Sequence, residues 1–386
     1  MSMNINGLSN TYNSINTNSK QYKALKEKGW LSGVIENESM MSPEEKMIYE
    51  IFGGRDTIIK NLMKQFDSDG DLLNANGVAG MDVTGKGTSW QKLTNVSELD
   101  LLCQTPASAL GSCRVKLKDP AVCADEYETI ISVLRKYNID CFIYIGGNDS
   151  MDTVDKLSKY LNAKGITDIT VVGAPKTIDN DLCGTDHCPG FGSAAKYIGT
   201  TFAELERDCH VYATKAVTIV EVMGRDAGWL TAASCLARAN GAKGPDFIYL
   251  CEVPFSIDTF LKDVKAKLEK QDAVIIAVSE GVKNKDGRYI SEEVQSSAVD
   301  SFGHSYIAGA AKVLEDAVRN EIGCKVRSIE LNLMQRCAAH LASATDIQES
   351  RMLGKTACQY ALEGATGMMA AVIRTSDKPY ATEFKA

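Results

Sequence analysis

Short apolar runs alternate with amphipathic segments along most of the 386-residue chain, and this alternation limits the fold more than any other feature. Runs of strand length occupy residues 141–145, 168–172, 217–222, 247–250, 273–278 and 326–331. Apolar residues at helical spacing predict helices near residues 229–239, 257–270, 309–320 and 356–364. Such a chain forms a mainly parallel sheet with helices on both faces, so the sequence predicts an α/β fold.

Charge and composition argue against several kinds of partner. The net charge of -8 disfavours nucleic acid and an anionic membrane surface. The longest apolar runs, 141–145 and 273–278, are far too short to cross a bilayer. The 12 cysteines are scattered without a CxxC pair, and no signal peptide precedes them. We therefore expect reduced thiols, no membrane or nucleic-acid partner, and a cytoplasmic location.

The first of three glycine-bearing polar segments follows the strand predicted at residues 141–145. It contains Gly146, Gly147, Asn148, Asp149 and Ser150. Glycines let the backbone approach a ligand, and the start of the next helix offers free N–H groups to anionic oxygens, with Ser150 as the expected N-cap. Taken alone, the segment fits an ordinary tight turn equally well.

The second segment, residues 175–181, places Lys176, Thr177, Asp179 and Asp181 directly after the next strand. A carboxylate beside a lysine can accept a proton while the ammonium group stabilises phosphate oxygens. A solvated loop with local turns is the alternative.

The third segment, residues 221–229, includes Gly224 and Arg225, and an arginine can bind a phosphate in bidentate fashion. The alternative is a surface ion pair of Arg225 with Asp226 or Glu221. Parallel sheets bind ligands at the carboxyl ends of their strands, where all three segments fall. Together they suit in-line phosphoryl transfer.

Other patterns predict less. Residues 67–71 resemble a calcium loop and residues 85–88 the end of a Walker A motif, but both lack the required context. Cys183, His187 and Cys188 have no second pair of zinc ligands at usable spacing. We expect structural roles for the four histidines.

The three segments together resemble the phosphofructokinase family. The matching blocks are residues 146–150, 175–181 with 184–186, and 223–225, with looser matches at 105–114 and 334–336. The resemblance implies two Rossmann-like, doubly wound, mainly parallel sheets with the active site in the cleft between them. It also implies Mg²⁺ as the cofactor and a homodimer or homotetramer.

The resemblance also implies individual roles. Asp179 resembles the base that removes the proton of the sugar 1-hydroxyl, with Lys176, Thr177 and Asp181 in the same catalytic site. Fructose 6-phosphate contacts are implied at Met223, Gly224, Arg225, Glu280 and Arg336, and at Arg327 through a neighbouring subunit. Donor contacts are implied at Gly147, Asp149, Ser150, Arg114 and Lys176, and Asn148 stands where many members carry a magnesium-associated aspartate.

Donor choice is expected at two positions. Members that use ATP usually carry glycine where this chain has Asp149 and Lys176, whereas members that use pyrophosphate carry aspartate and lysine. A carboxylate at Asp149 would repel the α-phosphate of a nucleotide, and Lys176 would add charge for a compact pyrophosphate. The resemblance thus implies reversible phosphoryl transfer from pyrophosphate to fructose 6-phosphate.

The N-terminal part departs from the family. Similar proteins open with a strand and a glycine loop that helps to hold the donor, whereas residues 19–30 here are lysine-rich. Alternatives are therefore a weak or inactive paralogue that acts as a regulatory subunit, or an ATP-dependent enzyme. The expected organisation is a divergent or disordered leader (1–30), a donor domain (31–192 plus 336–374), a fructose 6-phosphate domain (193–335) and a tail (375–386).

Overall fold

The computed structural model describes residues 20, 23, 106–108, 116–211, 213–293 and 309–386. A first parallel sheet has the strand order β1-β2-β7 and consists of β1 (Cys141–Gly146), β2 (Thr170–Pro175) and β7 (Met368–Met369). The register of β1 and β2 runs from Cys141 opposite Thr170 to Gly146 opposite Pro175. Both strands therefore end at the same level of the sheet, which brings the first two polar segments together.

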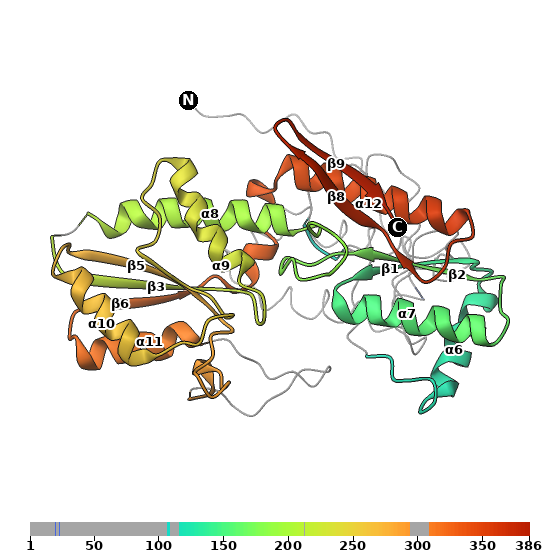
Figure 1. Ribbon diagram of the computed structural model, residues 1–386, viewed down its shortest axis with the longest axis horizontal. Coiled ribbons are helices and arrows are strands. Elements are labelled where there is room, and N and C mark those ends of the chain that lie inside the picture. Colours follow the sequence, from blue (N-terminus) through green and yellow to red (C-terminus); the bar gives the residue numbers. More distant parts are fainter. Residues whose placement is uncertain (1–19, 21–22, 24–105, 109–115, 212, 294–308) are drawn as a thin grey trace. The chain divides into compact units, whose positions relative to one another are not determined.

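Helices cover both faces of this sheet, with α7 (Asn148–Ala163) and α12 (Ala344–Leu362) on opposite sides of β1 and β2 (Figure 1). Successive residues of a strand point to opposite faces. Val172 and Ala174 accordingly pack with the α12 face, while the Sδ atom of Met151 in α7 lies against Gly173. Helix α6 (Ala124–Lys136) packs the ring of its Tyr127 4.7 Å from the ring of Tyr160.

The second sheet is also parallel, in the order β4-β5-β3-β6. Its strands are β3 (Ala216–Val222), β4 (Phe247–Tyr249), β5 (Ala273–Ser279) and β6 (Lys325–Glu330), and its helices are α8 (Phe191–Cys209), α9 (Trp229–Ala233), α10 (Ile257–Leu268) and α11 (Ala310–Glu321). Val220 and Val222 pack with Phe202 of α8 on one face. Val217 and Ile219 join the cluster of α10 and α11 on the other. The predicted doubly wound α/β fold is confirmed.

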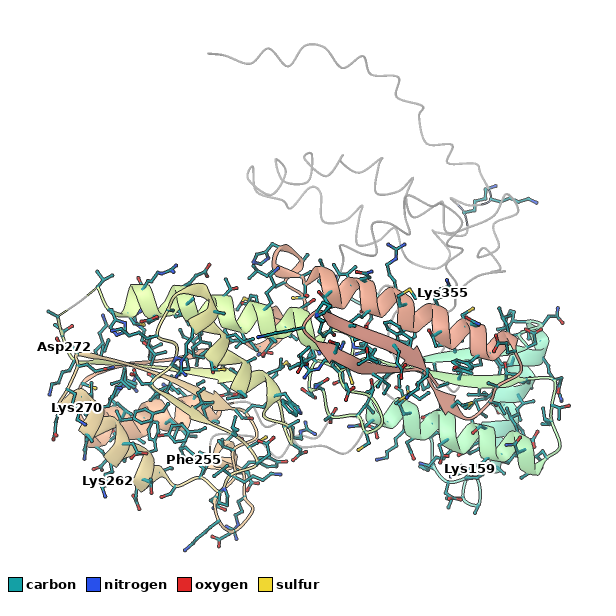
Figure 2. All side chains as sticks on the ribbon, turned by 45° about the horizontal axis from the view of Figure 1, so that its top comes forward. Lys159, Phe255, Lys262, Lys270, Asp272 and Lys355 are labelled. Carbon is teal, nitrogen blue, oxygen red and sulfur yellow. The ribbon has the colours of Figure 1, made fainter. Side chains whose placement is uncertain are left out.

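The helices are amphipathic, as their spacing predicts. Phe255 packs against Phe260 of α10 with ring centroids 5.8 Å apart, beneath the solvent-exposed surface. Exposed lysines such as Lys159 of α7, Lys262 of α10 and Lys355 of α12 extend from the opposite helix faces (Figure 2). Among the described residues, no helix has the length and apolarity needed to cross a membrane.

An antiparallel hairpin closes the chain, formed by β8 (Ala371–Asp377) and β9 (Tyr380–Lys385). Strand β9 and the end of β8 occupy most of the segment predicted as a tail, residues 375–386. The calcium-like loop, the Walker-like motif and all of the predicted leader except residues 20 and 23 lie outside the described residues, and the predicted domain boundaries stay predictions.

Two predicted helices were wrong in extent. The helix expected at 229–239 is α9 followed by a 3₁₀ helix, Ser234–Asn240. The helix expected at 356–364 begins at Ala344, where the Ser343 hydroxyl accepts the amide of Asp346 as an N-cap. Its first turns were missed because they bury two acidic residues, Asp346 and Glu349, which a hydrophobic pattern assigns to the surface.

Candidate active site

The first polar segment starts helix α7 directly from strand β1. Gly147 is the N-cap residue, and its carbonyl accepts the amides of Ser150 and Met151 at 3.0 Å each. The prediction of Ser150 as N-cap was therefore wrong. Gly146 is the tighter position, since a Cβ atom there would lie 2.0 Å from the Ser150 Oγ and force that side chain to move. Helix geometry leaves the amides of Asn148 and Asp149 without partners inside the helix, so they are available to an anion.

The second segment lies beside the first through two contacts. The amide of Lys176 donates to the carbonyl of Gly146 at 2.8 Å. The Asn148 Nδ2 donates to the Asp181 Oδ2 at 2.7 Å. The Thr177 Oγ1 accepts the amide of Asp179 at 3.1 Å, which forms a local turn around the predicted base.

Asp179 has the perturbed ionisation expected of a general base. Burial and, to a lesser degree, the nearby Asp181 carboxylate raise the pKa of Asp179 from its ordinary 3.8 to about 6. The positive charges of Arg225 and Lys176 oppose this shift by lowering the pKa. Arg225 comes from the third polar segment, so the segments after β2 and β3 act on the same carboxyl group.

The third segment turns sharply after β3. Gly224 has φ of 134°, and a Cβ atom there would lie 2.3 Å from the Ala227 carbonyl oxygen, so only glycine fits. Its amide donates to the Glu280 Oε1 at 3.1 Å. Asp226 pairs with Lys283 at 2.8 Å, and the Glu221 carboxylate accepts the amides of Gly309 and Ala311. Asp226 and Glu221 thus each have another partner, and the role of Arg225 stays a prediction.

A pocket lies at the carboxyl ends of β3, β5 and β6. Six side chains line it: Glu221, Met223, Glu280, Glu330, Asn332 and Gln335. Burial raises the pKa of Glu280 from 4.5 to about 7, with Glu221 and Asp179 adding to the shift while the amide of Gly224 and the charge of Arg225 oppose it. At neutral pH the Glu280 carboxyl can thus both donate and accept hydrogen bonds, as recognition of a sugar hydroxyl requires.

Arg327 and Arg336, two predicted sugar-phosphate contacts, are not among the residues that line this pocket. Arg327 stands opposite Thr218 in the sheet, away from the carboxyl end of β6, and its Nη1 lies 4.0 Å from the Asp208 Oδ2. Arg327 therefore lies apart from the other predicted sugar-binding residues of its own chain. Arg336 ends the 3₁₀ helix Asn332–Arg336 and is exposed next to Gln335. Arg114 lies outside the described residues.

Two residues of the site were missed by sequence reasoning. The Lys116 Nζ lies 3.4 Å from the Asp149 Oδ1, so the carboxylate expected to select the donor has a cationic partner. Nothing in the lysine-containing run around Lys116 marks this pairing. Gln335 is 2% exposed, and its Oε1 accepts the amide of Met223 at 3.2 Å. The backbone of the third segment is thereby fixed by a side chain from a distant part of the sequence.

A magnesium ion fits the arrangement around Asp181. Within the described ranges, no group of three or more histidine, cysteine or acidic side chains could hold a metal ion by itself. Mg²⁺ usually binds proteins through one or two carboxylates and takes its other ligands from water and substrate phosphates. The exposed Asp181 carboxylate with Asn148 beside it is a donor set of this kind.

Comparison with known proteins agrees with this geometry. Residues 71–361 match the family model for phosphofructokinase. The chain belongs to the phosphofructokinase family. Within the family it is 42% identical, over 72% of its length, to a pyrophosphate–fructose 6-phosphate 1-phosphotransferase of Xanthomonas campestris pv. campestris. The match covers 66% of that relative, so the chain spans about two thirds of its length.

Two further phosphofructokinase-family proteins bear on the substrate. A crystal structure of a pyrophosphate-dependent phosphofructokinase from Marinobacter aquaeolei is 35% identical, with a TM-score of 0.64 over 76% of this chain and 68% of that chain. A sulfofructose kinase of Alkalicoccus urumqiensis is 31% identical over 86% of this chain and 84% of that protein. The family is thus shared by proteins named for different sugar substrates.

Proposed function

We propose that the chain catalyses reversible transfer of a phosphoryl group from pyrophosphate to the 1-hydroxyl of fructose 6-phosphate, giving fructose 1,6-bisphosphate and phosphate. The observation that carries the proposal is the convergence of the polar segments on Asp179, which lies near Asp181, Arg225 and Lys176 and whose pKa burial raises to about 6. A general base works best when its pKa lies near the operating pH. The names of the pyrophosphate-dependent relatives support the choice of both substrates.

In this mechanism the Asp179 carboxylate accepts the proton of the sugar 1-hydroxyl as the hydroxyl oxygen attacks one phosphorus of pyrophosphate. The bond from that phosphorus to the bridging oxygen breaks, and phosphate leaves. Lys176 and Arg225, whose charges act on Asp179, stabilise the charge on the transferring group. The free amides at the start of α7 bind the oxygens of the donor. Little covalent chemistry is left to the protein, and catalysis depends on position and charge.

The donor is selected by charge. Asp149 disfavours the longer phosphate chain of a nucleotide, while Lys116 and Lys176 balance the charge of pyrophosphate. We further propose Mg²⁺ as cofactor, with Asp181 and Asn148 as the residues that would hold it. When bound, the ion would shield the negative charge of the donor.

The sugar would lie against Met223, Gly224 and Glu280, with its 1-hydroxyl towards Asp179 and Arg225 and its phosphate near Arg336. A homo-oligomer in the cytoplasm completes the proposal. In it, Arg327, which lies near Asp208 and apart from the carboxyl end of β6, contributes to the site of a neighbouring subunit.

The decisive experiment is a turnover assay of the purified chain with fructose 6-phosphate and either pyrophosphate or ATP. We expect turnover when pyrophosphate is the donor and no turnover when ATP is the donor. Strict dependence on ATP would refute the donor assignment, and sugar binding without turnover would favour the regulatory paralogue. Sulfofructose serves as the competing sugar in the same assay, because one relative is named for it.

Asp179→Asn separates chemistry from binding. We expect this variant to lose turnover and to bind fructose 6-phosphate almost as the wild type does, since the amide keeps the shape but cannot accept the proton. The double variant Asp149→Gly with Lys176→Gly should admit ATP as a donor. If ATP stays excluded, donor choice depends on other residues.

A further inference from the structure

The polar segment 175–181, which contains Asp179, begins a loop that runs from Thr177 to Gly190. Thr177 and Gly190 form a parallel β-bridge, so the loop they delimit returns to the point where it left β2. Inside the loop, Asn180 directly follows Asp179, adopts φ of 56°, and accepts the amide of Cys188 on its Oδ1 at 2.8 Å. The position of Asp179 therefore depends on where the far side of the loop is held.

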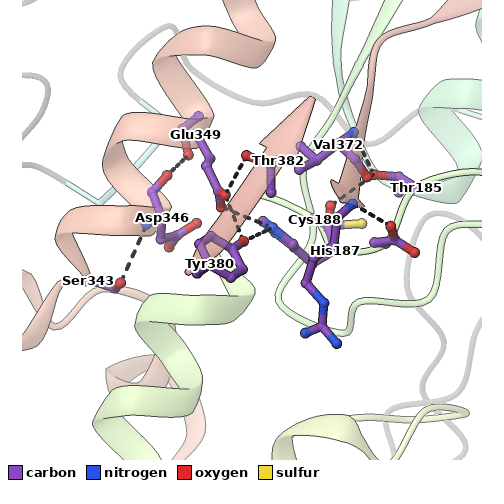
Figure 3. A network of polar contacts seen from close by, with 12 residues as sticks. Thr185, His187, Cys188, Ser343, Asp346, Glu349, Val372, Tyr380 and Thr382 are labelled. Atoms are coloured by element: carbon purple, nitrogen blue, oxygen red, sulfur yellow. Dashed lines mark hydrogen bonds and ion pairs between the residues drawn. The ribbon is translucent and has the colours of Figure 1, made fainter. Parts of the chain in front are cut away.

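A buried carboxylate of α12 holds the far side. Glu349 is 6% exposed, and its Oε2 lies 2.9 Å from the Nε2 of His187, the residue before Cys188. The Glu349 Oε1 accepts the hydroxyl of Tyr380 at 2.7 Å and that of Thr382 at 3.2 Å, as Figure 3 shows. The same Tyr380 oxygen is 3.0 Å from the His187 Nε2. A buried carboxylate is stable only while its donors are in place, so the loop, α12 and β9 hold one another in a single arrangement.

The loop has two further attachments on the same side. The Asp346 carboxylate, one turn before Glu349, accepts the amides of Gly190 at 2.9 Å and Ser193 at 3.1 Å, which open helix α8. The Thr185 Oγ1 accepts the amide of Val372 in β8 at 3.0 Å. The C-terminal helix and hairpin thus bind the loop along its length.

We propose that Glu349, His187 and Tyr380 are positioning residues for the phosphoryl-transfer reaction, acting on Asp179 through Cys188 and Asn180. None of the three is assigned a contact with substrate. The inference rests on the proposed function, because it assumes that Asp179 is the base. It gives β9, which lies in the segment predicted as a tail, a role in positioning the base.

Two isosteric variants test the proposal, Tyr380→Phe and Glu349→Gln. The first removes one hydroxyl and the second one charge, and neither changes the shape of the side chain much. Misplacement of a reacting group by about 1 Å costs on the order of a hundredfold in rate, so we expect kcat to fall by roughly ten- to a hundredfold. KM for fructose 6-phosphate should stay within about twofold, because Met223, Gly224 and Glu280 do not touch the network.

Hydrogen–deuterium exchange gives a second readout that does not need turnover. Amides of residues 176–190 should exchange faster in both variants, whereas those of β3 and β5 should keep their protection. Glu363→Gln is the matched control, since Glu363 lies exposed just after α12 and should leave both readouts unchanged.

The outcomes are separable from those of the proposed function. Wild-type turnover with pyrophosphate tests that function alone. If the wild type turns over and the variants keep kcat within about twofold, the positioning proposal is overturned, whatever the exchange shows. If the wild type does not turn over, exchange tests the network alone: unchanged protection of residues 176–190 overturns the proposal, and faster exchange confined to them supports the holding of this loop by Glu349 and Tyr380.

Discussion

Replacing Glu280 by glutamine should stabilise the protein at alkaline pH while it weakens sugar binding. The carboxyl group is half-buried, and its pKa rises from 4.5 to about 7 on folding. A raised folded pKa means that stability is fully present below pH 4.5 and is lost as the pH rises toward 7, because the unfolded chain ionises first. Linkage at about 1.36 kcal/mol per pKa unit then removes about 2.5 kcal/mol between pH 5 and pH 8.

Glu280→Gln should abolish this loss, since its side chain stays neutral and can still accept the amide of Gly224. The measurement is the free energy of unfolding in denaturant at pH 5 and pH 8. The gain of the variant over the wild type should grow by about 2.5 kcal/mol between the two. Glu269→Gln, at the exposed end of α10, is the control and should show no such growth. A gain that is independent of pH would refute the account of Glu280, and an unchanged KM for fructose 6-phosphate would remove it from the sugar site.

Three other outcomes follow from the geometry. Gly146→Ala should lower the free energy of unfolding by about 1–3 kcal/mol in thermal denaturation, because the new Cβ meets the Ser150 side chain. Adding Ser150→Gly to this variant should restore most of the lost stability. Lys116→Met should raise KM for pyrophosphate severalfold by leaving Asp149 unbalanced, with less than about 1 kcal/mol change in stability, whereas Lys118→Met should do neither. The rate kcat/KM should fall below a pH of about 6, where Asp179 gains its proton; an acid limb near pH 4 would show that burial does not control this group.

The convergence of the polar segments could be predicted because parallel strands end at a common edge. Gly146 and Pro175 stand level in adjacent strands, so the turns that follow them are neighbours by construction. The support behind the site could not be predicted in this way. Asp346 and Glu349 read as surface residues in a hydrophobic pattern, and they are buried only because loops far away in sequence supply their donors. Contacts of this kind leave no periodic signal.

The acidic residues of the site divide by environment, and the division matches the chemistry proposed for them. Asp179 and Glu280 are held where burial raises the pKa toward neutrality, so each can exchange or share a proton with a sugar hydroxyl. Asp149 and Asp181 lie instead beside Lys116 and Asn148, at the ends of the strands assigned to the donor, where a carboxylate can repel a nucleotide or bind a cation. A site for two anionic substrates can therefore carry these carboxyl groups, because Asp179 and Glu280 can each take up a proton and Asp149 has a cationic partner. Converting Asp181 to asparagine should consequently weaken magnesium-dependent use of pyrophosphate and spare binding of fructose 6-phosphate, which equilibrium binding of each substrate would measure. Equal loss of both affinities would contradict the division.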